Sequence, residues 1–256
     1  VHDFDADGLP DVLGTTGKGS DASSDFVWAR NKIGGGFEIR DNLPEARGDF
    51  LQGIEVVQAG PNALAAVLSW HEAEQGIQAY IIPGNPVGED WEWMKVTDVS
   101  QDEQLSVGDI DSDGDQDLLL GTIWLENHGN GSVTPHTLFQ TDSDPDRNRL
   151  VDVNRDGRLD AVVGYEAINV PGKLAWYENP PDSRQPWTEH VIANVVGPMS
   201  LDVADIDMDG DTDVVVGEHN YKNPETARLL VFSNLDGRGG GWREQLICTG
   251  DEHQIG

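Results

Sequence analysis

One nine-residue phrase, Asp-x-Asp/Asn-x-Asp-Gly-x-x-Asp, returns four times along the chain. The copies are Asp3–Asp11, Asp109–Asp117, Asp152–Asp160 and Asp205–Asp213. The first two copies start 106 residues apart, twice the 53-residue spacing of the last two, so we expect a further unit near residue 56. The stretch Ile54–Leu68 keeps the flanking apolar runs but lacks the aspartates, which predicts a repeat without an acidic loop.

Every unit also contains short apolar runs bounded by Gly, Pro, Asn or Asp, and none shows a sustained helical period. Third runs begin at Trp124, Trp176 and Val231, and closing runs begin at Trp187 and Trp242. Four strands in each unit of about 50 residues are typical of a β-propeller. We therefore predict an all-β propeller of four-stranded antiparallel blades with five repeats. The alternative is a five-repeat piece of a larger, seven- or eight-bladed propeller.

The repeat period also predicts the domain organisation. We expect one domain over residues 1–256, with repeats at approximately 1–53, 54–106, 107–149, 150–202 and 203–256. The end, Ile255–Gly256, resembles the residues just before the loop at Asp109, so the two termini look complementary. We expect the last blade to be closed by the N-terminal strand.

Composition narrows the possible partners. The chain has 47 acidic and 16 basic residues, a formal net charge of −31, which argues against nucleic acid as a partner. No apolar run approaches the ~18 residues that cross a bilayer, so no membrane span is expected. The single cysteine, Cys248, excludes an internal disulfide framework, and its apolar neighbours predict a buried side chain.

The acidic loops have the spacing of a calcium site. Oxygen ligands fall at positions 1, 3, 5 and 9, position 7 offers a backbone carbonyl, and Gly at position 6 permits a sharp turn, which suits Ca²⁺. An EF-hand needs Glu at position 12, where this chain has Gly14, Leu120, Val163 and Val216. The sequence therefore predicts calcium sites between strands, about four in number.

The predicted ligands follow directly from this register. They are Asp3, Asp5, Asp7, Leu9 and Asp11; Asp109, Asp111, Asp113, Asp115 and Asp117; Asp152, Asn154, Asp156, Arg158 and Asp160; and Asp205, Asp207, Asp209, Asp211 and Asp213. The side chains of Asp115 and Asp211, at position 7, are predicted to be solvated, and Asn154 should weaken the third site.

A calcium site that recurs once per blade more often stabilises a tight turn than catalyses a reaction. Loss of calcium should destabilise the fold, because empty loops leave their carboxylates to repel one another. Sites of this kind outside the cell bind at about 10⁻⁴ to 10⁻³ M. We therefore expect a secreted, extracellular or cell-surface protein.

These units resemble the FG-GAP or VCBS-type repeats of integrin α-subunit heads and of secreted microbial propellers. The resemblance rests on the acidic loop and the strand after it, as in Asp213–Gly217, and extends over the whole chain. It implies that each calcium loop joins the first and second strands of a blade, opposite the face that usually engages ligands. The unit without an acidic loop and the count of five depart from the seven-bladed integrin heads.

That arrangement would place the other connections together on the top face, around the channel. Candidate catalytic or binding residues there are His71, His219, His253, Tyr165, Lys222 and Arg147. Such a set can move a proton, position an acidic sugar or hold a metal through imidazoles. The alternative for each residue is an ordinary solvated loop side chain.

Two functions are compatible with this set. The favoured one is a binding module that recognises a glycan or a protein partner through the top face, as part of an adhesin, a surface assembly or a larger enzyme. The alternative is a polysaccharide lyase or sugar dehydratase acting by β-elimination, and catalysis is left open. There His219 or His253 would take the proton, Tyr165 would return one, and Lys222 or Arg147 would balance the enolate charge. The Glu-His pairs Glu218-His219 and Glu252-His253 resemble, weakly, those in propeller domains of sugar lyases and aldos-2-ulose dehydratases.

Overall fold

The structure is a computed structural model, and it describes residues 1–15, 26–45, 47–49, 51–60, 63–101 and 104–250. The chain divides into two compact units, one formed by Val1–Glu103 with Asn127–Val133 and the other by Gln104–Glu126 with Thr134–Gly256. The predicted His253 and the C-terminal pair Ile255–Gly256 lie outside the described residues.

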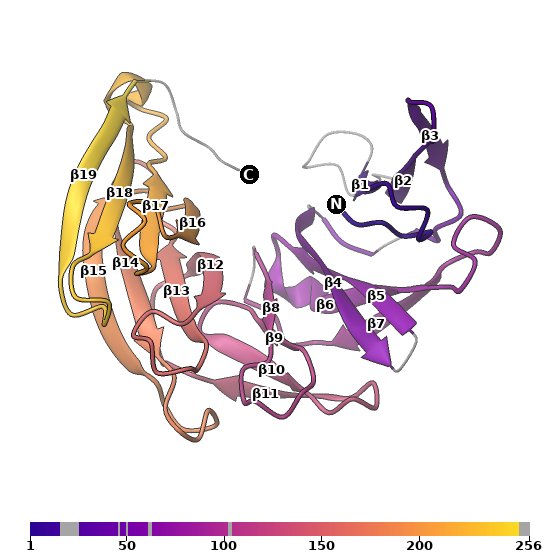
Figure 1. Cartoon of the computed structure of the whole chain (residues 1–256), viewed down its shortest axis with the longest axis horizontal. Coiled ribbons are helices and arrows are strands. Elements are labelled where there is room, and N and C mark those ends of the chain that lie inside the picture. Colours follow the sequence, from indigo (N-terminus) through magenta and orange to yellow (C-terminus); the bar gives the residue numbers. More distant parts are fainter. Residues whose placement is uncertain (16–25, 46, 50, 61–62, 102–103, 251–256) are drawn as a thin grey trace. The chain divides into compact units, whose positions relative to one another are not determined.

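The first unit contains two sheets (Figure 1). The first sheet has three described strands in chain order, and the second has four, with the short 3-10 helix η1 (Ala73–Gln75) between its second and third strands. The strands are β1 (Val12–Thr15), β2 (Phe26–Asn31) and β3 (Phe37–Arg40), then β4 (Leu51–Gly60), β5 (Ala63–Trp70), β6 (Ile77–Ile82) and β7 (Glu92–Thr97).

The second unit contains three four-stranded sheets, each with its strands in chain order. The third of them carries the 3-10 helix η2 (Pro224–Thr226) between its second and third strands. The strands are β8 (Ser106–Gly108), β9 (Asp117–Leu119), β10 (Ile123–Asn127) and β11 (Val133–Thr137); β12 (Pro145–Val151), β13 (Asp160–Tyr165), β14 (Pro171–Glu178) and β15 (Thr188–Val196); and β16 (Ser200–Ala204), β17 (Asp213–Gly217), β18 (Arg228–Asn234) and β19 (Trp242–Thr249).

The predicted fold class is confirmed. Successive antiparallel strands pair with their chain neighbours, as β12 with β13, β13 with β14 and β14 with β15, which is the architecture of a propeller blade. The described helical structure amounts to the two single-turn 3-10 helices. The chain is therefore all-β and built from propeller-type blades.

The sheets begin slightly ahead of the predicted repeat boundaries. Their first strands start at Leu51, Ser106, Pro145 and Ser200. In the second unit this shift arises because each acidic loop follows a first strand rather than opening the repeat. The last sheet takes all four of its strands from Ser200–Thr249, and no N-terminal strand joins it among the described residues. The closure of the chain through its two ends stays a prediction.

The second repeat follows its predicted form. Its apolar run folds as β4 and β5, whose register ends in a pairing of Gly60 with Ala63. Those strands continue where the other repeats have a nine-residue acidic loop. This repeat therefore has paired strands where the others have a candidate metal site.

Second and third strands form the core of the second unit. Along β13, Ala161, Val163 and Tyr165 pack with the sheet before, whereas Val162 packs with the sheet after. A strand covered on both faces carries a continuous apolar run, as β13 does. Trp176 on β14 is buried as well, in accord with a packing role for the blade tryptophans. In the first unit, Trp28 belongs to the core cluster shared by both sheets.

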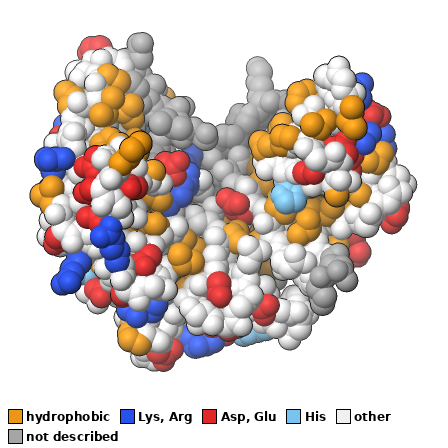
Figure 2. All heavy atoms as spheres, viewed as in Figure 1, with side chains coloured by type: hydrophobic (Ala, Val, Ile, Leu, Met, Phe, Trp, Pro, Cys, Tyr) orange, Lys and Arg blue, Asp and Glu red, His pale blue; other side chains and the backbone are white. Residues whose placement is uncertain are grey.

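Outer strands are more exposed than the core strands. The prediction that Cys248 is buried is wrong, because it lies exposed on the outermost strand β19, beside exposed Leu246 and Ile247. On the face drawn in Figure 2, hydrophobic side chains lie interspersed with acidic ones. No helix among the described residues is both long and apolar enough to cross a membrane.

Candidate functional site

The four acidic loops adopt one backbone conformation. Position 4 has a positive φ between 56° and 62° in every copy, at Ala6, Ser112, Arg155 and Met208. The glycine at position 6 has φ between 87° and 100°, a region that favours glycine, at Gly8, Gly114, Gly157 and Gly210. In the second unit each loop joins the first and second strands of its sheet, as the family resemblance implied.

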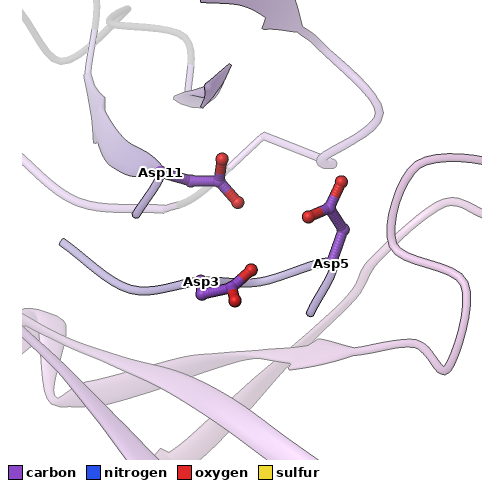
Figure 3. Close-up of side chains that lie close together, drawn as sticks. All are labelled: Asp3, Asp5 and Asp11. Carbon is purple, nitrogen blue, oxygen red and sulfur yellow. The ribbon is translucent and has the colours of Figure 1, made fainter. Parts of the chain in front are cut away.

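Three of the loops bring three carboxylates together. Ligand oxygens at positions 1, 3 and 9 lie within 4.8 Å of one another, in the groups Asp3, Asp5 and Asp11; Asp109, Asp111 and Asp117; and Asp205, Asp207 and Asp213. Figure 3 shows the first group, whose three carboxylates gather around a common space. In the third loop Asn154 stands at position 3, so that loop shares the backbone conformation but has one carboxylate fewer at these positions.

The aspartate at position 9 is buried in all four loops, at Asp11, Asp117, Asp160 and Asp213. Asp160 accepts hydrogen bonds from the backbone N–H groups of Val153 at 3.0 Å and Asn179 at 2.9 Å. Burial nevertheless raises the pKa of Asp160 to about 7, because lost hydration outweighs these two bonds. Burial also raises the pKa of Asp11. A bound cation would offset the cost of keeping these groups ionised.

Asp111 has the surroundings best suited to a cation ligand. Its side chain is only 4 % exposed, and its Oδ2 accepts a hydrogen bond from Arg184 at 2.7 Å. The other oxygen, Oδ1, is buried and makes no hydrogen bond of standard geometry, within the group formed with Asp109 and Asp117. Buried polar atoms are rarely left unsatisfied, so this oxygen fits a cation ligand. Burial, followed by the charge of Asp113, raises the pKa of Asp111.

Positions 5 and 7 serve the loop in other ways. The position 5 carboxylates, Asp7, Asp113, Asp156 and Asp209, each accept the backbone N–H of position 7 through Oδ1. The expectation of a solvated Asp211 is wrong: its side chain is largely buried and pairs with Arg155 of the preceding loop. Arg158, at position 7 of the third loop, pairs with Asp156 and donates to the carbonyl of Asn179.

Arginines accompany the acidic loops throughout. Each position 3 carboxylate outside the third loop pairs with an arginine. Asp5 pairs with Arg30, Asp111 pairs with Arg184, and Asp207 pairs with Arg243 at 3.7 Å. These arginines are three of the 16 basic residues of the chain. Each of these three cations therefore neutralises part of a three-carboxylate group through its position 3 member.

Asparagines that end third strands tie neighbouring sheets of the second unit together. Asn179, at the end of the third strand, donates through Nδ2 to the carbonyl of Ile110 in the preceding acidic loop at 3.0 Å. Asn234 does the same to the carbonyl of Val153 at 3.2 Å, and its own N–H donates to Asp213. The third acidic loop is therefore held both by its own sheet, through the N–H of Asn179 on Asp160, and by the next sheet, through Asn234.

The predicted top-face residues fall into different settings. His71, in the first unit, is exposed, and its Nδ1 lies 3.2 Å from the Oδ2 of Asp49. His219, in the second unit, is 2 % exposed and packs edge to face with Tyr221. Lys222 is exposed beside it. Lys222 and His219 thus belong to the same connection, while His71 lies in the other unit.

Two further candidates lie on strands rather than in connections. Tyr165 ends β13 in the core, where its hydroxyl bonds that of Tyr177, and burial raises its pKa. Arg147 lies on β12 and pairs with the buried Asp146. Neither side chain occupies the loop position that the elimination scheme assigns to it.

Glu218, next to His219, is an anchor of the fold. It accepts hydrogen bonds from the backbone N–H of Val196 at 3.1 Å and from the Nη2 of Arg228 at 2.6 Å. The Nε and the backbone N–H of Arg228 donate to its other oxygen at 3.0 Å. A carboxylate so fully engaged fixes the start of the connection between β17 and β18.

Sequence reasoning assigned no role to the strand-end asparagines or to Arg184. The asparagines were visible as a recurring residue after the aromatic runs, at Asn127, Asn179 and Asn234. Arg184 left no such signal, because it reaches a loop 73 residues away in sequence.

The fold and its loops define an all-β protein of propeller-type blades with acidic loops between first and second strands. The FG-GAP-like repeat family matches residues 152–216, which include the third acidic loop and the fourth. The resemblance to FG-GAP-type repeats is therefore confirmed over this segment. No curated protein matches the chain.

Two solved structures show a distant likeness. A thermostable family-43 glycoside hydrolase is 12 % identical, with a TM-score of 0.49, covering 100 % of this chain and 99 % of the other. A bifunctional GH43-CE protein of Bacteroides eggerthii is 11 % identical, with a TM-score of 0.47, covering 94 % of this chain and 35 % of the other. Likeness at this level says nothing of activity.

Proposed function

We propose that this chain is a calcium-stabilised propeller module that works outside the cell and binds a carbohydrate or protein partner through its strand connections. The observation that carries the calcium part is Asp111, whose buried Oδ1 makes no hydrogen bond of standard geometry inside a three-carboxylate group. A hard cation with oxygen ligands satisfies that atom and neutralises the group. The repetition of the group in two other loops supports the same role there.

At the second loop, Asp109, Asp111 and Asp117 would hold the ion, with Asp113 and the carbonyl of Asp115 completing the set. Calcium would supply positive charge to carboxylates that burial otherwise penalises. Its contribution is to stability and loop geometry.

The third loop should bind calcium most weakly. Asn154 removes one charge from the set, and Arg158 already pairs with Asp156. We therefore expect three tighter sites, in the first, second and fourth loops, and one weaker site in the third loop. Affinities of about 10⁻⁴ to 10⁻³ M, usual for extracellular modules, would keep such loops filled outside the cell.

Binding is favoured over elimination by the settings of the candidate acids and bases. A general base must reach the substrate, and His219 is buried under Tyr221. Tyr165 is buried in the core, and its hydroxyl is hydrogen-bonded to that of Tyr177. The elimination scheme stays a prediction, and His253 lies outside the described residues.

The calcium part is tested by thermal unfolding in excess chelator and at increasing Ca²⁺. Each site should add about 2.7 kcal/mol to the free energy of unfolding at a free Ca²⁺ concentration 100 times its Kd. Titration calorimetry should count the ions. A melting temperature that is the same in chelator and in 10 mM Ca²⁺, on the order of ten times the expected Kd, would contradict the proposal.

A further inference from the structure

The connection between β17 and β18 is fixed by many hydrogen bonds yet presents an aromatic ring to solvent. Tyr221 is 57 % exposed, and every residue from Tyr221 to Thr226 is exposed, whereas Glu218, His219 and Asn220 just before it are buried. Tyrosine is enriched at binding surfaces because it combines an apolar ring with a polar hydroxyl. This exposed ring is therefore a candidate binding feature.

Both ends of the connection are held in place. Glu218 is anchored by Arg228 and by the N–H of Val196. Asn220 donates to the hydroxyl of Thr226 at 3.1 Å and accepts the N–H of Asn223 at 3.2 Å. The turn is thus closed on itself, and little freedom remains to be lost when a ligand binds.

A neighbouring connection clamps the turn from the side. Asn169, between β13 and β14, donates its N–H to the carbonyl of His219 at 3.3 Å and accepts the N–H of Lys222 at 2.8 Å. The residues on either side of it, Ile168 and Val170, are exposed. The two connections together therefore present an aromatic ring, two aliphatic side chains and the polar Lys222.

Tyr221 contacts the ring of His219 and remains largely exposed. His219 and Tyr221 have centroids 4.0 Å apart and planes at 75°, a T-shaped contact. Whichever ring contributes the edge, at least one face of Tyr221 is not covered by the imidazole. The buried His219 therefore contacts the phenol ring, while Tyr221 stays exposed to solvent over more than half of its surface.

We propose that Tyr221 is a stacking platform for a neutral sugar ring. A pyranose has an apolar C–H face, which suits the phenol ring, and a rim of hydroxyls, which suits Lys222 and Asn223. The formal charge of −31 disfavours acidic sugars at long range. This inference rests on the carbohydrate-binding part of the proposed function, and names its site and ligand class.

The experiment is affinity electrophoresis of the folded chain in Ca²⁺-containing native gels. The gels contain a neutral β-glucan, galactomannan or dextran, or the acidic polygalacturonate, and an empty gel serves as reference. The variants are Tyr221→Ala and Tyr221→Phe, with Phe37→Ala in the other unit as a matched loss of an exposed aromatic ring. Thermal unfolding of each variant establishes that it is folded.

We expect retardation in at least one neutral gel for the wild type, Tyr221→Phe and Phe37→Ala. Tyr221→Ala should lose affinity about tenfold or more, because the stacking face is gone. Equal retardation of Tyr221→Ala would place the sugar site elsewhere, and retardation in polygalacturonate alone would overturn the neutral ligand. No retardation in any gel would overturn the inference and point to a protein partner, while calcium-dependent melting would still stand or fall separately.

Discussion

The side-chain amide of Asn179 donates to the carbonyl of Ile110 at 3.0 Å, so the third strand of one sheet holds the acidic loop of the sheet before it. The same amide donates to the carbonyl of Leu159, and the Asn179 N–H donates to Asp160. One asparagine thus joins two candidate calcium loops. Because Asn179 contacts both loops, ion binding at one loop should also restrict the motion of the other.

Asn179→Ala should destabilise the protein by about 2 kcal/mol, because it leaves buried carbonyls without donors. Urea denaturation at saturating Ca²⁺ measures this change. Asn130→Ala, in an exposed hairpin where the side chain bonds only Ser132 nearby, is the control and should be close to neutral. Equal stability of the two variants would show that the hydrogen bonds of Asn179 do not stabilise the acidic loop.

Asp111→Asn should weaken calcium binding at the second loop by about tenfold or more, because it removes one charge from the ligand set. The side-chain shape is nearly unchanged, so the fold should persist. Asp115→Asn is the matched control, since position 7 is expected to bind through its backbone carbonyl. Titration calorimetry should find one weakened site in the first variant and none in the second. Loss of affinity in both would argue for a general charge effect instead.

Asp160 gives the metal-free fold a pH dependence of definite sign. Its pKa of about 7 lies above the ordinary value near 4, so its contribution to stability is fully present below about pH 4 and is lost as pH rises through 7. An ion at this loop favours the ionised form and reverses the trend. Stabilisation by Ca²⁺ should therefore grow between pH 5 and about pH 8.

Proton release provides the direct measurement. Calcium binding at pH 6.5, on the order of half a unit below the pKa of Asp160, should release protons. Calorimetry in two buffers of different ionisation enthalpy detects them. Asp160→Asn removes the titrating group and should reduce the release, whereas an unchanged proton count in that variant would assign the protons to other carboxylates.

The loops were predictable because their determinants are local. The order of aspartates and the glycine at position 6 specify a turn within nine residues, and the four copies share one backbone conformation. The hairpin at Gly60 and Ala63 was predictable for the converse reason, since its sequence lacks those aspartates.

The settings of the other candidates depend on distant parts of the chain. His219 is buried partly because Asn169, from a different repeat, closes against its connection. Tyr165 lies at a strand end where alternation puts it on the face that packs with the preceding sheet. Cys248 has apolar neighbours but belongs to an outermost strand, so its neighbours are exposed with it. Spacing alone contains none of these relationships.

Glu126 is the final test of how the loops are supported. It accepts hydrogen bonds from Arg184, which also contacts Asp111, and lies 2.6 Å from the Nε2 of His136. The hydrogen bond from Arg184, opposed by burial and assisted by His136, lowers the pKa of Glu126. A lowered pKa means stability that is present above the unfolded value, about 4.3, and is lost as pH falls through the folded value.

Glu126→Gln should therefore cost about 1 to 3 kcal/mol at pH 7, and the difference from the wild type should shrink as the solution is acidified below about pH 4. Glu178→Gln is the matched control, because Glu178 meets His190 at the equivalent place in the next sheet, at 3.1 Å, and is far more exposed. Its effect should be smaller, since exposed pairs contribute little. Urea midpoints of the three proteins from pH 3 to pH 7 decide the matter. A Glu126→Gln deficit that persists unchanged at pH 3 would show that packing, and not the charge that Arg184 shares with Asp111, accounts for it.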